Sequence, residues 1–334
     1  MSVRSGLIAA CLSATVCLTA PISAFAAFED SAADRDALNN EARMLWRAGD
    51  FEAAEAAFKD ALDAYPDDAK LMTNLGYLER QRGRMDKSIA WFRRSADTGE
   101  DWYNYLRLAV VYTDIGDRPG MYWAARRLDE TAPIEKAGQG FRLLLSEDWS
   151  AAQAFAEARM AEGGDPEYWR ELAAYAAAMR GDVDGALAHF RAGYQELFEK
   201  APKLAPGRPT APLWIAWLEQ QRGDSARAET MVRLVLDAIP RKPAGEHESV
   251  YNNTFRMVAY ALLGDDDEAL TELRNGVENG LRMRLFDNVV RYESLPMLAK
   301  LHQRETFWRN MSVIYMDNAR MRAALSEAPA QRVN

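Results

Sequence analysis

Apolar residues recur at helical spacing on both sides of a turn at Gly49-Asp50. They form one stripe before the turn and a second stripe after it, with the members Leu38, Ala42 and Leu45, then Phe51, Ala54, Phe58 and Ala61. This periodicity predicts a pair of amphipathic helices between residues 36 and 66, where Pro66 ends the pattern. One helical hairpin cannot bury its apolar face alone, so further hairpins are expected to stack against it.

The hairpin pattern returns along most of the chain, usually around a glycine. The turn glycines are Gly49, Gly83, Gly116, Gly181, Gly223 and Gly264. A less regular unit around Trp149 and Phe155 lies between the third and the fifth. The repetition predicts an all-α fold, a right-handed α-solenoid of about seven helix-turn-helix repeats. A long helical tract over residues 298–324 is expected to form a C-terminal capping helix.

Proline-rich stretches interrupt the later repeats. We expect repeat units 1 to 5 over residues 27–200, a connector at 201–212, units 6 and 7 with the helical cap at 213–326, and a tail at 327–334. Such stretches form loops or stiff connectors, which leaves open whether the array bends into two lobes. Gly76 in the second unit is expected to allow close helix packing, since glycine inside a helix costs about 1 kcal/mol.

The first 26 residues have the pattern of a secretion signal. An apolar core from Leu7 to Ala20 follows the single charge of Arg4, and Ala24-Phe25-Ala26 fits a cleavage site. The pattern predicts a cleaved signal peptide at 1–26 and a periplasmic or secreted protein, with no stable membrane insertion after cleavage. The alternative is a retained anchor, because residues 5–28 carry no charge. Both cysteines lie in the segment to be removed, which fits an oxidising compartment.

Composition and motifs argue against several classes of function. The chain has 334 residues and a formal net charge of −9, spread along its helices, which disfavours a nucleic-acid surface. Its three histidines, His189, His247 and His302, are too far apart for a zinc helix. Phosphate-binding loops and nucleophile elbows are also missing from the sequence. We therefore predict no catalytic residues, no metal and no cofactor.

The repeated pattern resembles that of the tetratricopeptide-repeat family, whose unit is a 34-residue helix-turn-helix. The resemblance rests on the turn glycines, on the first-helix pairs Leu75-Gly76 and Leu108-Ala109, and on closing prolines such as Pro66. It covers about residues 36–280. Residues 257–301 are similar to a terminal repeat block of some bacterial transcriptional regulators and nucleotide cyclases. The resemblance implies an adaptor-like module without catalytic activity.

In a solenoid of this kind the first helices of successive repeats line a concave groove. Placed by helical spacing, the candidate groove residues are Asn39, Arg43, Trp46, Arg47, Asn74, Tyr77, Arg80, Tyr103, Leu106, Arg107, Tyr168, Tyr175 and Trp217. Aromatic rings beside guanidinium groups are typical of binding hot spots and suit an extended peptide, an acidic motif or a sugar chain. The alternative is that some of these rings pack against a second helix as core.

These observations predict an exported, non-catalytic scaffold that binds a protein or peptide partner in its concave groove. The alternative is a carbohydrate-binding or envelope polysaccharide-machinery component, because the groove is rich in tryptophan and tyrosine. An enzyme is the third possibility, disfavoured by the lack of any cluster of nucleophile, base or metal ligand.

Overall fold

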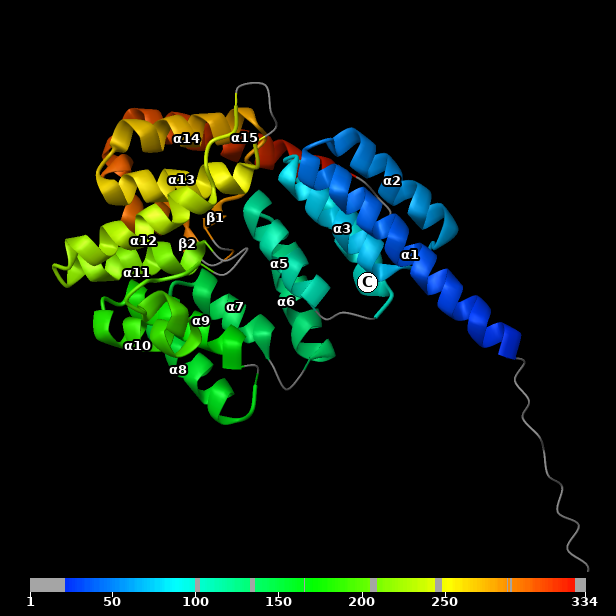
Figure 1. Ribbon diagram of the computed structural model, residues 1–334, viewed down its shortest axis with the longest axis horizontal. Helices are drawn as coiled ribbons and strands as arrows, with labels where there is room; N and C mark the ends of the chain where they lie inside the picture. Colours follow the sequence, from blue (N-terminus) through cyan, green and yellow to red (C-terminus); the bar gives the residue numbers. More distant parts are fainter. Residues whose placement is uncertain are drawn as a thin grey trace, which may run out of the picture.

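The computed structural model describes residues 22–99, 103–132, 136–164, 166–204, 209–243, 248–286, 288 and 290–327. Within these ranges fifteen α-helices form seven hairpins and one C-terminal helix, which confirms the predicted all-α solenoid (Figure 1). The first helices of the hairpins are α1 (Ile22–Ala48), α3 (Ala69–Gln81), α5 (Tyr103–Ile115), α7 (Ala137–Leu145), α9 (Pro166–Met179), α11 (Thr210–Gln221) and α13 (Val250–Leu263). The second helices are α2 (Phe51–Ala64), α4 (Met85–Asp97), α6 (Arg118–Thr131), α8 (Trp149–Ala161), α10 (Val183–Gly193), α12 (Ser225–Ala238) and α14 (Asp266–Glu278).

Five of the seven hairpin turns consist of a glycine followed by an aspartate, while in the second hairpin Arg84 follows Gly83 and its side chain does not cap α4. Each turn glycine has a positive φ, for example +79° at Gly181, which glycine adopts without steric cost. The side chain of Asp182 then accepts a hydrogen bond from the amide of Gly185 and caps α10. The same aspartate caps begin the second helices at Asp50, Asp117, Asp148, Asp224 and Asp265. In the irregular fourth hairpin Glu147 replaces the glycine at φ +58°.

Small residues on the first helices let the paired helices approach closely. A Cβ atom added to Gly76 of α3 would lie 2.5 Å from the ring of Phe92 on α4. The hydroxyl of Ser88 donates to the carbonyl of Gly76 at 2.8 Å across the same contact. The close packing expected at Gly76 is therefore present in the second hairpin.

The chain beyond α14 closes the array. It forms a two-residue antiparallel pair, β1 (Leu285–Phe286) with β2 (Val290–Arg291), then 3₁₀ turns at Tyr292–Ser294, Pro296–Leu298 and Leu301–Gln303, then α15 (Glu305–Glu327). Helix α15 contacts α14 and also α4 and α5, so it runs from the last hairpin back to the second and third (Figure 1). The expected cap thus begins at residue 305 instead of 298, and it joins the last hairpin to the second and third.

Further contacts between the ends hold this closure. The amide of Gln81, at the end of α3, donates to the hydroxyl of Ser249 before α13 at 3.2 Å. The turn glycine Gly83 packs directly against the backbone of Gly280, which follows α14. These partners are about half the chain apart in sequence, so the second to seventh hairpins complete a nearly closed circuit.

Two predicted segments lie mainly outside the described residues. Of the predicted signal peptide only residues 22–26 are described, as the beginning of α1, and of the predicted tail only residue 327. Where the connector was expected, α11 begins at Thr210, so Pro212 lies in its first turn, where proline is tolerated. Among the helices described here, none combines the length and the apolar character needed to cross a bilayer.

Charged side chains join the first hairpin to the second. Glu55 on α2 accepts hydrogen bonds from Lys59 at 2.6 Å, from Arg82 at 2.6 Å and from Arg84 at 3.2 Å. Partial burial alone would raise the pKa of Glu55, but the hydrogen bond from Lys59 and the three positive charges lower it from 4.5 to about 2. The ionised carboxylate is therefore the form that stabilises this contact.

This network predicts a pH-dependent contribution to stability. Because the pKa of Glu55 is lower in the folded chain, its stabilisation is present above pH 4.5 and is lost as the pH falls towards 2. With allowance for solvent screening, we expect Glu55→Gln to lower the free energy of unfolding by about 1 kcal/mol at pH 6. Urea denaturation at pH 6 and pH 3 should show this difference shrink at the lower pH. An equal loss of unfolding free energy at pH 6 and pH 3 would contradict the low pKa of Glu55. Glu305→Gln, at an exposed position of α15, is the control.

Candidate functional site

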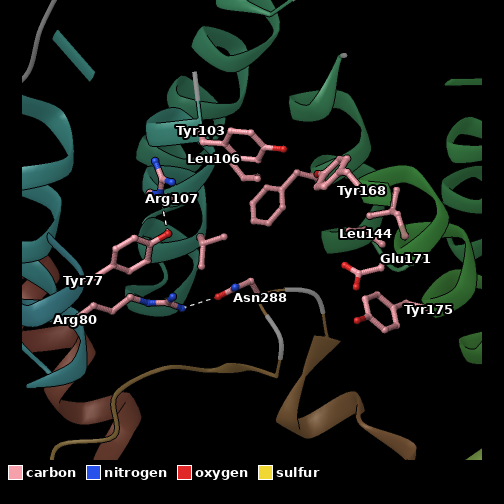
Figure 2. A pocket seen from close by; sticks show the side chains of 13 residues that line it. Tyr77, Arg80, Tyr103, Leu106, Arg107, Leu144, Tyr168, Glu171, Tyr175 and Asn288 are labelled. Carbon is pink, nitrogen blue, oxygen red and sulfur yellow. Dashed lines mark hydrogen bonds between the residues drawn. The ribbon is translucent and has the colours of Figure 1, made fainter. Parts of the chain in front are cut away.

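A pocket of about 240 Å³ opens on the concave side of the array. Thirteen side chains line it, and they come from the first helices α3, α5, α7 and α9 of four consecutive hairpins and from the turn between β1 and β2 (Figure 2). They are Tyr77, Arg80, Tyr103, Leu106, Arg107, Val110, Phe141, Leu144, Tyr168, Glu171, Leu172, Tyr175 and Asn288.

Helical spacing explains why these residues meet. On α5 the lining positions are 103, 106, 107 and 110, and on α9 they are 168, 171, 172 and 175. Residues three and four positions apart share one face of a helix, so each helix presents a single stripe to the pocket. The opposite faces of the same helices carry the small and apolar residues of the core, such as Ala109 and Ala173.

Arg107 lies between two tyrosines at one wall of the pocket. Its Nε donates to the hydroxyl of Tyr77 at 2.7 Å, and its Nη1 donates to Oδ1 of Asn104 at 2.8 Å. The guanidinium carbon lies 5.4 Å from the ring centroid of Tyr77 and 5.9 Å from that of Tyr103, within the range of cation–π attraction. These contacts fix the position of a positive charge beside the pocket.

Arg80 closes the base of the pocket through a buried ion pair. Its Nη2 donates to Asp114 of α5 at 3.0 Å. The same nitrogen donates to Oδ1 of Asn288 at 2.9 Å (Figure 2). Burial alone would lower the pKa of Arg80, but the neighbouring Tyr251 hydroxyl and the Asp114 carboxylate raise it. The backbone amide of Arg284 also donates to Asp114, at 2.8 Å. The C-terminal segment therefore forms part of the pocket.

The structure brings together seven of the candidate residues chosen from the sequence. Those that line the pocket are Tyr77, Arg80, Tyr103, Leu106, Arg107, Tyr168 and Tyr175. Tyr175 is nevertheless almost fully buried, and its ring packs against Phe190 and Trp214. Arg80 also differs from the expected solvent-facing position, because its charge is neutralised by Asp114. The binding role of each residue stays a prediction.

The remaining candidates lie outside the pocket. They are Asn39, Arg43, Trp46, Arg47, Asn74 and Trp217. Asn74 donates to Asn39 at 2.6 Å, and Trp46 donates to Gln81 at 2.7 Å while its ring packs against Phe58 of α2. Trp217 packs edge-on against Trp214. For Trp46 the alternative expected above, packing against a second helix, describes the observed contact, whereas the partner of Trp217 lies on its own helix α11. Arg43 is half-buried and Arg47 is exposed.

Several lining residues were not predicted. Phe141 and Leu144 belong to the irregular fourth hairpin, whose first helix has only nine residues. Glu171 could have been found from its spacing to Tyr168. Asn288 had no local signal, because it enters from a turn that no repeat pattern predicts.

Metal-binding groups were also sought in the described ranges. Within them, no three histidine, cysteine, aspartate or glutamate side chains lie close enough to hold a metal ion. The pocket itself presents one carboxylate, that of Glu171, beside two arginines.

Comparison with known proteins places the first hairpins in a family. Residues 39–104 match the tetratricopeptide repeat family. These residues extend from α1 to the start of α5, so they cover the second hairpin completely and reach the first helix of the third. No curated protein matches the sequence.

Solved structures similar to the chain include a tetratricopeptide repeat protein from Parabacteroides merdae, with 16% identity over 84% of this chain and 98% of the other, at a TM-score of 0.43. Pseudomonas aeruginosa pilF shares 10% identity over 85% of this chain and 98% of its own, at a TM-score of 0.36. YrrB, described as having an unusual peptide-binding site, shares 13% identity over 67% of this chain and 92% of its own, at a TM-score of 0.28.

At these identities and TM-scores, the similarities carry no information on what the chain binds. The family match and the fold stand independently of them. The matched residues 39–104 form helical hairpins that the rest of the described chain repeats. Residues 39–104 are therefore similar to tetratricopeptide repeats, and the described chain has the fold of a helical-hairpin solenoid.

Proposed function

We propose that the protein is an exported, non-catalytic scaffold that binds a protein or peptide partner through its concave pocket. The observation that carries the proposal is that side chains from four consecutive first helices meet in one hollow of about 240 Å³.

Export is proposed from the signal-like residues 1–26. Mass spectrometry of the chain purified from fractionated cells identifies its first residue. A mature chain that begins near residue 27 is expected, and a chain that begins at residue 1 would contradict export by a cleaved signal.

The size and lining of the pocket favour one inserted side chain of a partner. Sites for drug-sized ligands and cofactors usually occupy about 300–1,000 Å³, and this pocket is smaller. Its wall combines the apolar side chains of Leu106, Val110 and Leu144 with the polar groups of Arg107 and Glu171. An apolar or aromatic anchor within a peptide matches this arrangement, because such anchors supply most of the energy of protein interfaces.

Carbohydrate binding is the second candidate, and the tyrosines of the pocket are the observation in its favour. Sugars bind aromatic residues by lying across the faces of the rings. Here the guanidinium of Arg107 lies over the rings of both Tyr77 and Tyr103. Since both rings are already in contact with this cation, the arrangement favours a peptide.

Filling the pocket tests the proposal. Leu106→Trp places a bulkier side chain in the hollow, and Leu263→Trp makes the same change at an exposed position on α13. Peptides selected from a random library on the wild-type protein are expected to bind the Leu106→Trp variant at least about tenfold more weakly, the loss typical of a blocked hot spot. Fluorescence polarisation measures this difference, and binding to Leu263→Trp should be unchanged.

Two outcomes would overturn the peptide assignment. One is equal affinity for the wild-type protein and the Leu106→Trp variant, which would place the binding surface elsewhere. The other is the absence of any selected peptide together with glycan-array binding that Leu106→Trp abolishes, which would assign the pocket to a sugar. Unfolding midpoints of both variants, measured by circular dichroism, show whether the fold is retained.

A further inference from the structure

A second hollow, of about 390 Å³, gathers arginines at the edge of the array. It lies between the turn that joins α5 to α6, the C-terminal end of α7, the β1–β2 segment and α15. Its five arginines are Arg118, Arg142, Arg284, Arg291 and Arg322. The protein as a whole carries a formal charge of −9, so this concentration of positive charge runs against its composition.

Three of the five arginines are held in place by carboxylates. Arg142 pairs with Asp129 at 3.0 Å, Arg284 pairs with Glu293 at 2.9 Å, and Arg291 pairs with Glu147. Each of these pairs uses the Nη2 atom of the arginine. A guanidinium has five N–H donors, so each side chain is oriented by its partner and keeps donors for a ligand. The Nε of Arg284 is buried without a hydrogen-bond partner.

The other two arginines have no carboxylate partner within the part of the chain that the structure describes. Arg118 is exposed in the first turn of α6, and its side chain forms no hydrogen bond with any residue that the structure describes. Arg322 of α15 donates through Nη1 to the carbonyls of Ile115 and Gly116, at 3.1 and 3.2 Å. The one carboxylate that lines the hollow, Asp117, already caps α6 by accepting from the amide of Gly120. The two unmatched charges therefore face the hollow from two sides.

We propose that this hollow binds a ligand that carries an oligophosphate group. A tetrahedral phosphate has several anionic oxygens that can accept from guanidinium groups approaching from different directions, as they do here. A single carboxylate is planar and suits one guanidinium, and Asp129 and Glu293 each accept from one arginine here. An adjoining hollow shares Arg118 and Arg322, so a chain of two or three phosphates has room to extend. The site is separate from the concave pocket and does not depend on the function proposed for it.

Isothermal titration calorimetry with inorganic tripolyphosphate at 150 mM NaCl tests the proposal on the full-length protein. We expect saturable one-to-one binding and a loss of about tenfold in affinity for Arg118→Ala and for Arg322→Ala, as expected when a charge-assisted hydrogen bond is removed. Arg126→Ala removes the same charge from an exposed position of α6 and should leave the affinity unchanged. Because Arg118 has no structural partner among the described residues, its variant should keep the thermal midpoint of the wild type.

Three results would overturn the proposal. One is the absence of binding. Another is an equal loss in Arg126→Ala, which would show general attraction to surface charge. The third is citrate binding as tightly as tripolyphosphate, which would assign the hollow to carboxylates. Comparison of tripolyphosphate with a nucleoside triphosphate then distinguishes a free oligophosphate from a nucleotide, since tighter binding of the nucleotide requires contacts beyond the phosphates.

Discussion

Replacing Asp114 by alanine is expected to lower the free energy of unfolding by about 3–5 kcal/mol, the usual loss when one partner of a buried ion pair is removed. The side chain of Asp114 is fully buried, and that of Arg80 is 5% exposed. Without the carboxylate, the Arg80 guanidinium and the amide of Arg284 would both lose a buried acceptor. Urea denaturation followed by circular dichroism measures the effect.

The control is Asp267→Ala, which removes an aspartate from an exposed pair. Asp267 accepts from Arg304 at 2.8 Å, but its side chain is 87% exposed, so a loss below about 1 kcal/mol is expected. Equal losses in the two variants would contradict the role assigned to Asp114. Hydrogen exchange adds a local test, because Asn318 of α15 donates to the backbone carbonyl of Asp114 at 2.7 Å. Protection of α15 should fall in the Asp114 variant and stay the same in the control.

Gly83→Ala is expected to destabilise the protein by about 2 kcal/mol more than Gly181→Ala. Both glycines lie in a hairpin turn with similar positive φ, +73° and +79°. Alanine at either position would therefore cost about 1 kcal/mol of backbone strain. At Gly181 nothing lies within 4 Å of the added methyl group, whereas at Gly83 it would overlap the carbonyl oxygen of Gly280. Forcing an atom into packed backbone typically costs about 1–3 kcal/mol.

Thermal unfolding of the two variants side by side measures this difference. Both variants have the same backbone strain, so the additional destabilisation of Gly83→Ala measures the contact between the second hairpin and the end of α14. Equal destabilisation would show that the two ends of the array are not in contact in solution. A third variant, Gly223→Ala, has the same open surroundings as Gly181 and should agree with it.

The hairpins could be predicted from the sequence because their determinants are local. A turn glycine, an aspartate cap and an apolar stripe all lie within about thirty residues of each other. The same local spacing placed Tyr103, Leu106 and Arg107 on one face of α5, and all three line the pocket. On α5 periodicity was therefore enough to place the lining side chains, whereas six candidates chosen by the same spacing on other helices lie outside the pocket.

The closure of the array could not be predicted in this way. The hydrogen bonds from Arg80 to Asn288 and from Asn318 to Asp114 join residues separated by 208 and 204 positions. No local pattern relates such partners, and Arg80 was accordingly expected in the open groove. The arginine hollow was missed for the same reason, since its charges come from segments that are scattered along the chain. An even distribution of charge in the sequence did not exclude a concentrated one in the fold.

The junction of Gly83 with Gly280 also restricts how this protein can evolve. Open solenoids gain or lose units readily, because each unit touches only its immediate neighbours. Here an inserted or deleted hairpin would carry the last helices past the second hairpin or stop them short of it, and the bonds of Asp114 would be lost. Duplication of a unit, the ordinary way in which such proteins lengthen, would therefore be selected against in this one, and its number of repeats should stay constant across its descendants.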